Sequence, residues 1–220
     1  MKAGDTGGIG GGPGTTLLVI AKEPLPGRVK TRLVPPYTFE QAALLAEAAL
    51  SDTLAAVLAA PACRRVLVLD GAAGPWLPEG FEVLQQCEGG LDERLASAFA
   101  SVCGPSLLIG MDTPQVVPDL LAVGWEGVDA WFGPAADGGF WALGLRDPDP
   151  DLLRGIPVST PDTGAAQLLR LREAGLQVAR LPVLRDVDTA GDVAAVAALA
   201  PGTRFAACAD RIATGRGDRP

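Results

Sequence analysis

The strongest constraint on the fold is an apolar run that ends in a glycine and an aspartate, LLIGMDTPQVVP at residues 107–118. No polar residue interrupts its first part, which predicts a strand buried on both faces of a sheet. Pro114 ends that strand because proline cannot donate a hydrogen bond to a sheet ladder. Asp112 is therefore expected at the carboxyl end of a central strand, the edge at which open α/β sheets bind their ligands.

Asp112 has two interpretations at this stage. A carboxylate at a strand end is placed to hold a divalent metal ion against phosphate oxygens, and Gly110 beside it lets a ligand approach the backbone closely. Alternatively, the Asp112 side chain only caps the turn that follows the strand.

Further apolar runs alternate with segments of high helix propensity. The expected strands are 16–21, 66–70, 81–85, 107–110, 129–132, 140–145 and 178–184, and the main expected helices are 38–60, 91–102, 163–174 and one after Thr189. Two of these helix starts, Thr38 with Gln41 and Thr189 with Asp192, have the spacing of a capping box. The alternation predicts a single α/β domain, residues 16–213, around a largely parallel sheet. The glycine-rich leader at 1–15 is expected to be flexible, and the tail at 214–220 disordered.

Composition excludes several classes of function. The formal net charge of −8 argues against nucleic acid as the main partner, because binding to a phosphate backbone needs a basic field. The chain has no histidine, which removes histidine-based catalytic triads and histidine-ligated zinc sites. No apolar run approaches the roughly 20 residues of a membrane helix, and the N-terminus lacks the apolar core of a signal peptide. A cytoplasmic protein without membrane contact is expected.

Positive charge is concentrated in one segment, Lys22–Tyr37, directly after the first strand. Its prolines and glycine prevent a regular helix. Its cations are Lys22, Arg28, Lys30 and Arg32. They indicate either a loop that binds phosphate oxygens or an ordinary solvated loop. Arg94, in the first turn of a later helix, either lies near the same ligand or pairs with Glu93 or Asp92 on the surface.

Three further aspartates lie at expected strand ends. Asp137 precedes Gly138 and Gly139, which either leaves its carboxylate uncovered for a ligand or marks a plain hairpin turn. Asp186 and Asp188 both follow the last strand. Since Mg²⁺ typically takes one or two protein carboxylates together with water and substrate phosphates, Asp112 and a second strand-end aspartate can share one Mg²⁺ or Mn²⁺.

Four segments, KEPLPGRVKTRL, GMDTP, GPAADGGFWALGL and DVDTAGD, resemble the radical-SAM/selenodomain-associated transferase family. That family belongs to the glycosyltransferase-A superfamily of nucleotide-diphospho-sugar transferases, which also contains nucleotidyltransferases. The resemblance implies a Rossmann-like α/β/α sandwich with a mostly parallel central sheet.

The resemblance also implies roles for individual residues. Asp112 and Asp188 would bind the metal, and Asp112, Asp137 and Lys30 would be catalytic. The residues implied to bind nucleotide phosphates are Lys22, Gly27, Arg28, Lys30, Arg32 and Arg94. Asp137, Gly138 and Gly139 would form the acceptor loop.

Two positions depart from the family pattern. Met111 stands where serine or threonine is usual, and Asp92 replaces a small residue. Asp92 is expected to add negative charge near the nucleotide, which puts contacts with the base and activity itself in question.

The leading expectation is glycosyl transfer from a nucleotide-sugar to a small-molecule acceptor, assisted by Mg²⁺ or Mn²⁺. The first alternative is nucleotidyl transfer, in which a phosphorylated acceptor attacks an NTP and pyrophosphate leaves. The second is a nucleotide-binding protein without catalysis, because fold does not guarantee chemistry. The sequence leaves the acceptor, the nucleotide base and the oligomeric state open.

Overall fold

The computed structural model describes residues 14–215, so the predictions for most of the leader and for residues 216–220 lie outside the described part. Its strands are β1 Thr16–Lys22, β2 Arg64–Asp70, β3 Glu82–Gln85, β4 Ser106–Gly110, β5 Ala130–Pro134, β6 Phe140–Leu145 and β7 Val178–Arg180. Its α-helices are α1 Phe39–Ala59, α2 Leu91–Ala100, α3 Pro118–Leu121, α4 Thr163–Glu173, α5 Ala190–Leu199 and α6 Arg204–Ala213. Two 3₁₀ turns, η1 Thr31–Leu33 and η2 Pro150–Leu152, complete the described elements.

The strands of residues 14–215 form one seven-stranded sheet in the order β3-β2-β1-β4-β6-β5-β7. The pairs β3–β2, β2–β1, β1–β4 and β5–β7 are parallel, whereas β6 runs antiparallel to both of its neighbours. The predicted single α/β domain with a mostly parallel sheet is confirmed.

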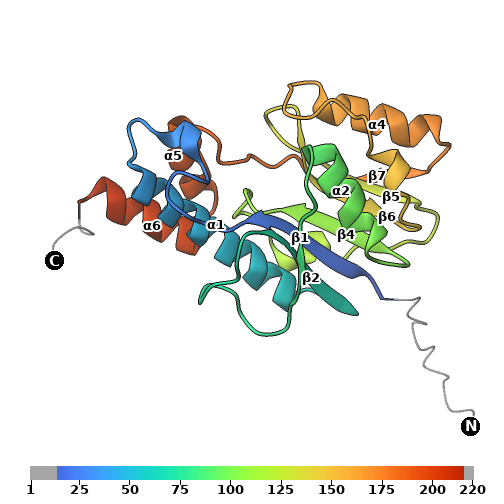
Figure 1. Cartoon of the computed structure of the whole chain (residues 1–220), viewed down its shortest axis with the longest axis horizontal. Coiled ribbons are helices and arrows are strands. Elements are labelled where there is room, and N and C mark those ends of the chain that lie inside the picture. The colour runs from blue at the N-terminus through green and yellow to red at the C-terminus, as the bar shows by residue number, and fades with distance from the viewer. Residues whose placement is uncertain (1–13, 216–220) are drawn as a thin grey trace, which may run out of the picture.

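Helices cover both faces of this sheet, with α1 on one side and α2 and α4 on the other (Figure 1). Side chains of β1 alternate between the two faces: Leu17 and Val19 pack toward α1, and Leu18 packs toward α2. The central strand β1 is therefore apolar from Leu17 to Ala21, as expected for a strand buried on both sides. A third cluster joins α1 to α5 and α6 at one end of the molecule.

Helix α1 has the capping box predicted for Thr38, whose hydroxyl accepts a hydrogen bond from the Gln41 N–H while the Gln41 side chain accepts one from the Thr38 N–H. This helix is long and apolar enough to cross a membrane, by length and composition. The expectation that no segment of the chain reaches that length was wrong here. Of its most apolar window, 56% is buried inside the domain, as in a core helix.

Two predicted boundaries were also wrong. Strand β7 ends at Arg180 rather than at Leu184, because Pro182 has no N–H to donate to the ladder. Leu184 pairs with Ala135 only as an isolated bridge. The leader was predicted to extend to Thr15, yet the Thr15 hydroxyl accepts a hydrogen bond from the Trp125 indole at 2.8 Å.

The segment with Asp137 forms the tight turn of the β5–β6 hairpin, which confirms the hairpin interpretation. Gly139 donates its N–H to the Asp137 carboxylate at 2.8 Å. Gly138 has a φ of 92°, a left-handed conformation that favours glycine. A Cβ at this position would come within 2.0 Å of the Pro161 carbonyl oxygen. The turn is thus packed directly against the segment that leads into α4.

We expect Gly138→Ala to destabilise the protein by at least ~2 kcal/mol, because it adds a backbone clash to the cost of positive φ. Urea unfolding measures this loss. Gly155→Ala is the matched control, since Gly155 has a φ of 71° but no atom within 4 Å of an added Cβ. Equal losses in the two variants would show that the contact with Pro161 carries no extra cost.

Candidate active site

A cleft of about 880 Å³ opens at the carboxyl ends of β1 and β4. Its walls come from the loop after β1, the start of α2, the β5–β6 turn, the segment before α4 and the segment before α5. These segments are far apart in the sequence, and the parallel sheet brings their ends to one edge. The cleft therefore lies where ligands of open α/β sheets bind.

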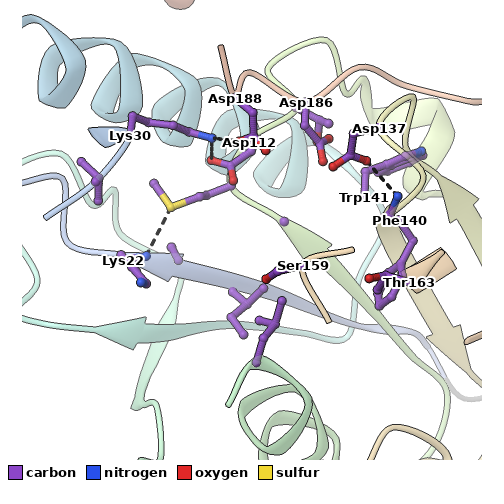
Figure 2. Close-up of a pocket in the computed structure, with 18 of the residues that line it drawn as sticks. Lys22, Lys30, Asp112, Asp137, Phe140, Trp141, Ser159, Thr163, Asp186 and Asp188 are labelled. Atoms are coloured by element: carbon purple, nitrogen blue, oxygen red, sulfur yellow. Dashed lines mark hydrogen bonds and ion pairs between the residues drawn. The ribbon is translucent and has the colours of Figure 1, made fainter. Parts of the chain in front are cut away.

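Three predicted residues meet at the centre of the cleft (Figure 2). The Lys30 ammonium lies 2.8 Å from Asp112 Oδ1 and 3.1 Å from Asp188 Oδ1. It donates a hydrogen bond to Asp188. Its contact with Asp112 is an ion pair whose angles do not meet the criteria for a hydrogen bond. Within residues 14–215, no backbone N–H donates to the Asp112 carboxylate, so the turn-capping interpretation of Asp112 has no support in the structure.

Lys30 is held tightly in this position. Only 8% of its side chain is exposed. Burial alone would lower the pKa of Lys30, but the negative charges of Asp112 and Asp188 outweigh it and raise that pKa above its usual value. Its backbone is also left-handed, with a φ of 48°, a strained state for a residue with a side chain. The two carboxylates thus keep a buried ammonium charged at the centre of the cleft.

Two arginines of the cleft are anchored by a residue that the sequence did not single out, Asp70 at the end of β2. Arg94 donates to Asp70 Oδ2 at 3.2 Å, and Arg28 donates to Asp70 Oδ1 at 3.4 Å. Arg94 therefore faces the cleft and is not paired with Glu93 or Asp92, which resolves that alternative. Asp70 went unnoticed because a strand-end aspartate has no local signal for its distant partners.

The other predicted cations also line the cleft. Arg32 is largely exposed and lies 3.7 Å from Asp188 Oδ2. Lys22 lies at the end of β1, and its backbone N–H donates to the Met111 sulfur at 3.2 Å. Met111 stands where the family pattern has serine or threonine. It is 7% exposed, and its side chain fills space beside the ends of β1 and β4.

The predicted glycines have different positions. Gly139 lines the cleft together with Asp137, but Gly138 and Gly27 do not. Gly27 has a φ of 76° and open space where a Cβ would lie, so its conformation serves the turn before Arg28. Its contact with phosphate stays a prediction.

Asp92 was expected to place negative charge near the nucleotide, and its position does not fit that expectation. Its carboxylate accepts a hydrogen bond from the Gly155 N–H at 3.1 Å, and the residue does not line the cleft. Asp92 therefore ties α2 to the loop after η2.

Asp186 is a cleft residue that the sequence-based assignment of candidate site residues left out. Its Oδ1 atom is buried and has no hydrogen-bond partner among the described residues. Burial, together with the nearby charges of Asp112 and Asp137, raises the pKa of Asp186 to about 7. Its position in the DVDT segment gave a signal, but only Asp188 of that segment was selected.

We expect Asp186→Asn to change how stability depends on pH. Because the pKa of Asp186 is higher in the folded state than its ordinary 3.8, the folded protein binds more protons between pH ~4 and ~7. Its free energy of unfolding should therefore fall as pH rises through this range, by up to about 1.4 kcal/mol per pH unit. The asparagine variant should lose this component and be the more stable protein at pH 8, with little difference at pH 4. Urea unfolding at both pH values measures this, and parallel profiles would contradict it.

Comparison with known proteins places the chain in a family. Residues 44–160 match the profile of a family described as "uncharacterized protein conserved in bacteria" (DUF2064), which is more than half of the chain. The chain belongs to the DUF2064 family. A comparison of this DUF2064 member with curated proteins gave no significant match.

Solved structures share its fold. A candidate nucleotide-diphospho-sugar transferase from Desulfovibrio desulfuricans G20 is 26% identical, with a TM-score of 0.80 over 92% of this chain and 96% of that one. Rv0371C from Mycobacterium tuberculosis H37Rv, solved as a complex with manganese, is 23% identical with a TM-score of 0.51 over 84% and 97% of the two chains. The 2-C-methyl-D-erythritol 4-phosphate cytidylyltransferase of Thermus thermophilus is 18% identical, with a TM-score of 0.51 over 86% and 99%.

These similarities confirm the glycosyltransferase-A-like fold of this DUF2064 protein. The fold is common to nucleotide-sugar transferases and nucleotidyltransferases, so it does not distinguish between the two reactions.

Proposed function

We propose that this protein is a divalent-metal-dependent transferase for a nucleotide-activated donor, with glycosyl transfer from a nucleotide-sugar as its reaction. The observation that carries the proposal is the convergence of Asp112 and Asp188 on the Lys30 ammonium, within 2.8 and 3.1 Å. The four sequence segments that resemble the radical-SAM/selenodomain-associated transferases include all three residues, and we place the protein with that family as part of the proposal.

The residues at this point suit Mg²⁺ or Mn²⁺. Asp112 and Asp188 already converge on one cation, and Asp112 Oδ1 is buried without a hydrogen bond from any described residue. Hard divalent cations prefer such carboxylate oxygens. In residues 14–215, no three acidic or cysteine side chains are grouped so that they could hold a metal ion, so waters and donor phosphates would have to supply the ligands beyond these two carboxylates. When bound, the metal would neutralise phosphate charge and stabilise the leaving nucleoside diphosphate.

The charge balance of the cleft supports a metal requirement. The cationic side is largely compensated, because Arg28 and Arg94 share Asp70, and Lys30 is held between two carboxylates. A polyphosphate therefore meets positive charge that carboxylates of the protein partly offset. We expect Lys22, Arg28, Arg32 and Arg94 to orient the donor phosphates once a divalent cation occupies the carboxylates.

In the proposed transfer, a hydroxyl oxygen of the acceptor forms a bond to the anomeric carbon of the donor sugar. The bond between that carbon and the diphosphate oxygen breaks, and its electron pair leaves with the nucleoside diphosphate. Asp137, which is exposed at the cleft, is the candidate to take the hydroxyl proton.

Nucleotidyl transfer is the second candidate function. The lysine- and arginine-rich loop after β1 suits a triphosphate, and the Thermus cytidylyltransferase has the same fold. The two reactions differ in what they release. We expect incubation with NTPs or UDP- and GDP-sugars, Mg²⁺ and an acceptor pool to release nucleoside diphosphate, as measured by a coupled assay. Pyrophosphate release would favour the second function, and no turnover with any donor would favour a non-catalytic nucleotide-binding protein.

We expect Asp112→Asn to lower Mg²⁺-dependent nucleotide affinity at least ~10-fold, because it removes a ligand charge while it keeps the side-chain shape. Titration calorimetry with and without Mg²⁺ measures the effect. Asp119→Asn, on the exposed first turn of α3, is the matched control. Unchanged metal-dependent affinity in Asp112→Asn would remove Asp112 from the metal site.

A further inference from the structure

The cleft has a cationic side and an acidic side. Among the described residues that line it, every lysine and arginine lies in residues 22–32 or is Arg94. On the opposite side, formed by the β5–β6 turn and the segment before α5, the lining residues include Asp137 and Asp186 and no cation. Arg185 belongs to the same segment, but it does not line the cleft and is paired with Asp192 at 2.8 Å. In Figure 2, Lys22 and Lys30 lie at one side, Asp112 and Asp188 between, and Asp186 and Asp137 at the other.

The acidic side and the adjoining end of β4 contain polar atoms that no described residue satisfies. Thr113 is 1% exposed and lines the cleft directly after Asp112, yet its hydroxyl has no hydrogen-bond partner. Oδ1 of Asp186 is likewise buried and unpartnered. Buried polar groups are normally hydrogen-bonded, and each one that is not calls for a ligand or another explanation. Besides Asp112 Oδ1, which is assigned to the metal, these two atoms indicate a place in the cleft where a ligand supplies hydrogen bonds.

Other side chains on this side are suited to an uncharged polar ligand. Ser159, Thr160 and Thr163 line the cleft in the segment before α4. Phe140, at the start of β6, adds an aromatic ring to the lining. Carboxylates accept hydrogen bonds from ligand hydroxyls, and serine and threonine hydroxyls can both accept and donate them. The net charge of this side comes from the carboxylates alone, which repel an anion. Asp186 provides no positive charge in either protonation state.

We propose that the acceptor of this enzyme is a hydroxyl-rich compound without phosphate or carboxylate groups, bound between Asp137, Asp186 and Thr113. The inference rests on the proposed function and specifies its substrate class. The donor phosphates take the cationic side with the metal ion, so a phosphate on the acceptor would lie close to the negative charges of Asp137 and Asp186 with no lining cation beside it. In its preference for an acceptor without phosphate, the protein would differ from the 2-C-methyl-D-erythritol 4-phosphate cytidylyltransferase, a relative in fold whose name contains a phosphorylated compound.

Matched acceptor pairs test the proposal with the full-length protein. Glycerol and glycerol 3-phosphate, myo-inositol and inositol 1-phosphate, and glucose and glucose 6-phosphate differ only in the phosphate. With Mg²⁺ and UDP- or GDP-sugars, we expect kcat/KM for the unphosphorylated member to exceed that for its partner at least ~10-fold, because like charges brought together disfavour the wrong ligand. Equal or better use of the phosphorylated members would overturn the proposal.

A charge-removing variant links the preference to the named residues. Asp137→Asn with Asp186→Asn should shift the ratio of kcat/KM values toward the phosphorylated member by ~10-fold or more, whatever the loss in absolute rate. The single variant Asp137→Asn, at an exposed position, should shift it in the same direction if the double variant fails to fold. Asp151→Asn, exposed and outside the cleft, is the matched control. An unchanged ratio in both cleft variants would overturn the proposal.

Ligand-observed NMR separates this inference from the proposed function. With Mg²⁺ and nucleotide present but no turnover, binding of an unphosphorylated member in preference to its partner would support the substrate class while it removes the proposed transfer. Turnover restricted to phosphorylated acceptors would support the proposed transfer but overturn the inferred substrate class. Binding of none of the unphosphorylated members would also overturn the inference.

Discussion

The candidate site depends on one electrostatic contact, the buried ammonium of Lys30 between Asp112 and Asp188. A lysine with 8% of its side chain exposed loses most of its hydration, and a charge in that position persists only with close counter-charges. The two carboxylates supply them from β4 and from the segment before α5. This ion-pair cluster fixes the loop after β1 over the sheet edge, and the strained backbone of Lys30 shows how firmly the loop is held.

The remaining charges of the cleft are arranged around this cluster. Asp70 restrains Arg28 and Arg94 on one side of the cleft. On the other side, the hairpin turn and Asp186 present negative charge and unsatisfied oxygens. Such a polarised cleft can orient a two-part substrate, with the anionic donor at the basic side and an uncharged acceptor at the acidic side. Preorganised charge of this kind would be the main resource of the proposed transfer, because the chain has no histidine.

The fold could be predicted from the sequence in most of its detail, because its signals are local. Uninterrupted apolar runs identified the strands, capping boxes at Thr38 and Thr189 identified two helix starts, and the hairpin at Asp137 was one of two stated interpretations. The errors have local physical causes as well. Pro182 shortens β7, and the burial of α1 inside the domain is invisible in its composition.

The site was predictable in part. The sequence alone determined that cations follow β1 and that aspartates follow buried strands, since both are properties of residue order. Only the tertiary structure decided which of them meet: that Lys30 lies between Asp112 and Asp188, that Asp70 holds Arg94, that Asp92 faces away, and that Asp186 lies buried in the cleft. The physical reason is that these pairings join strand ends far apart along the chain. Their distances are set by strand order and register, which are properties of the whole sheet rather than of any one segment.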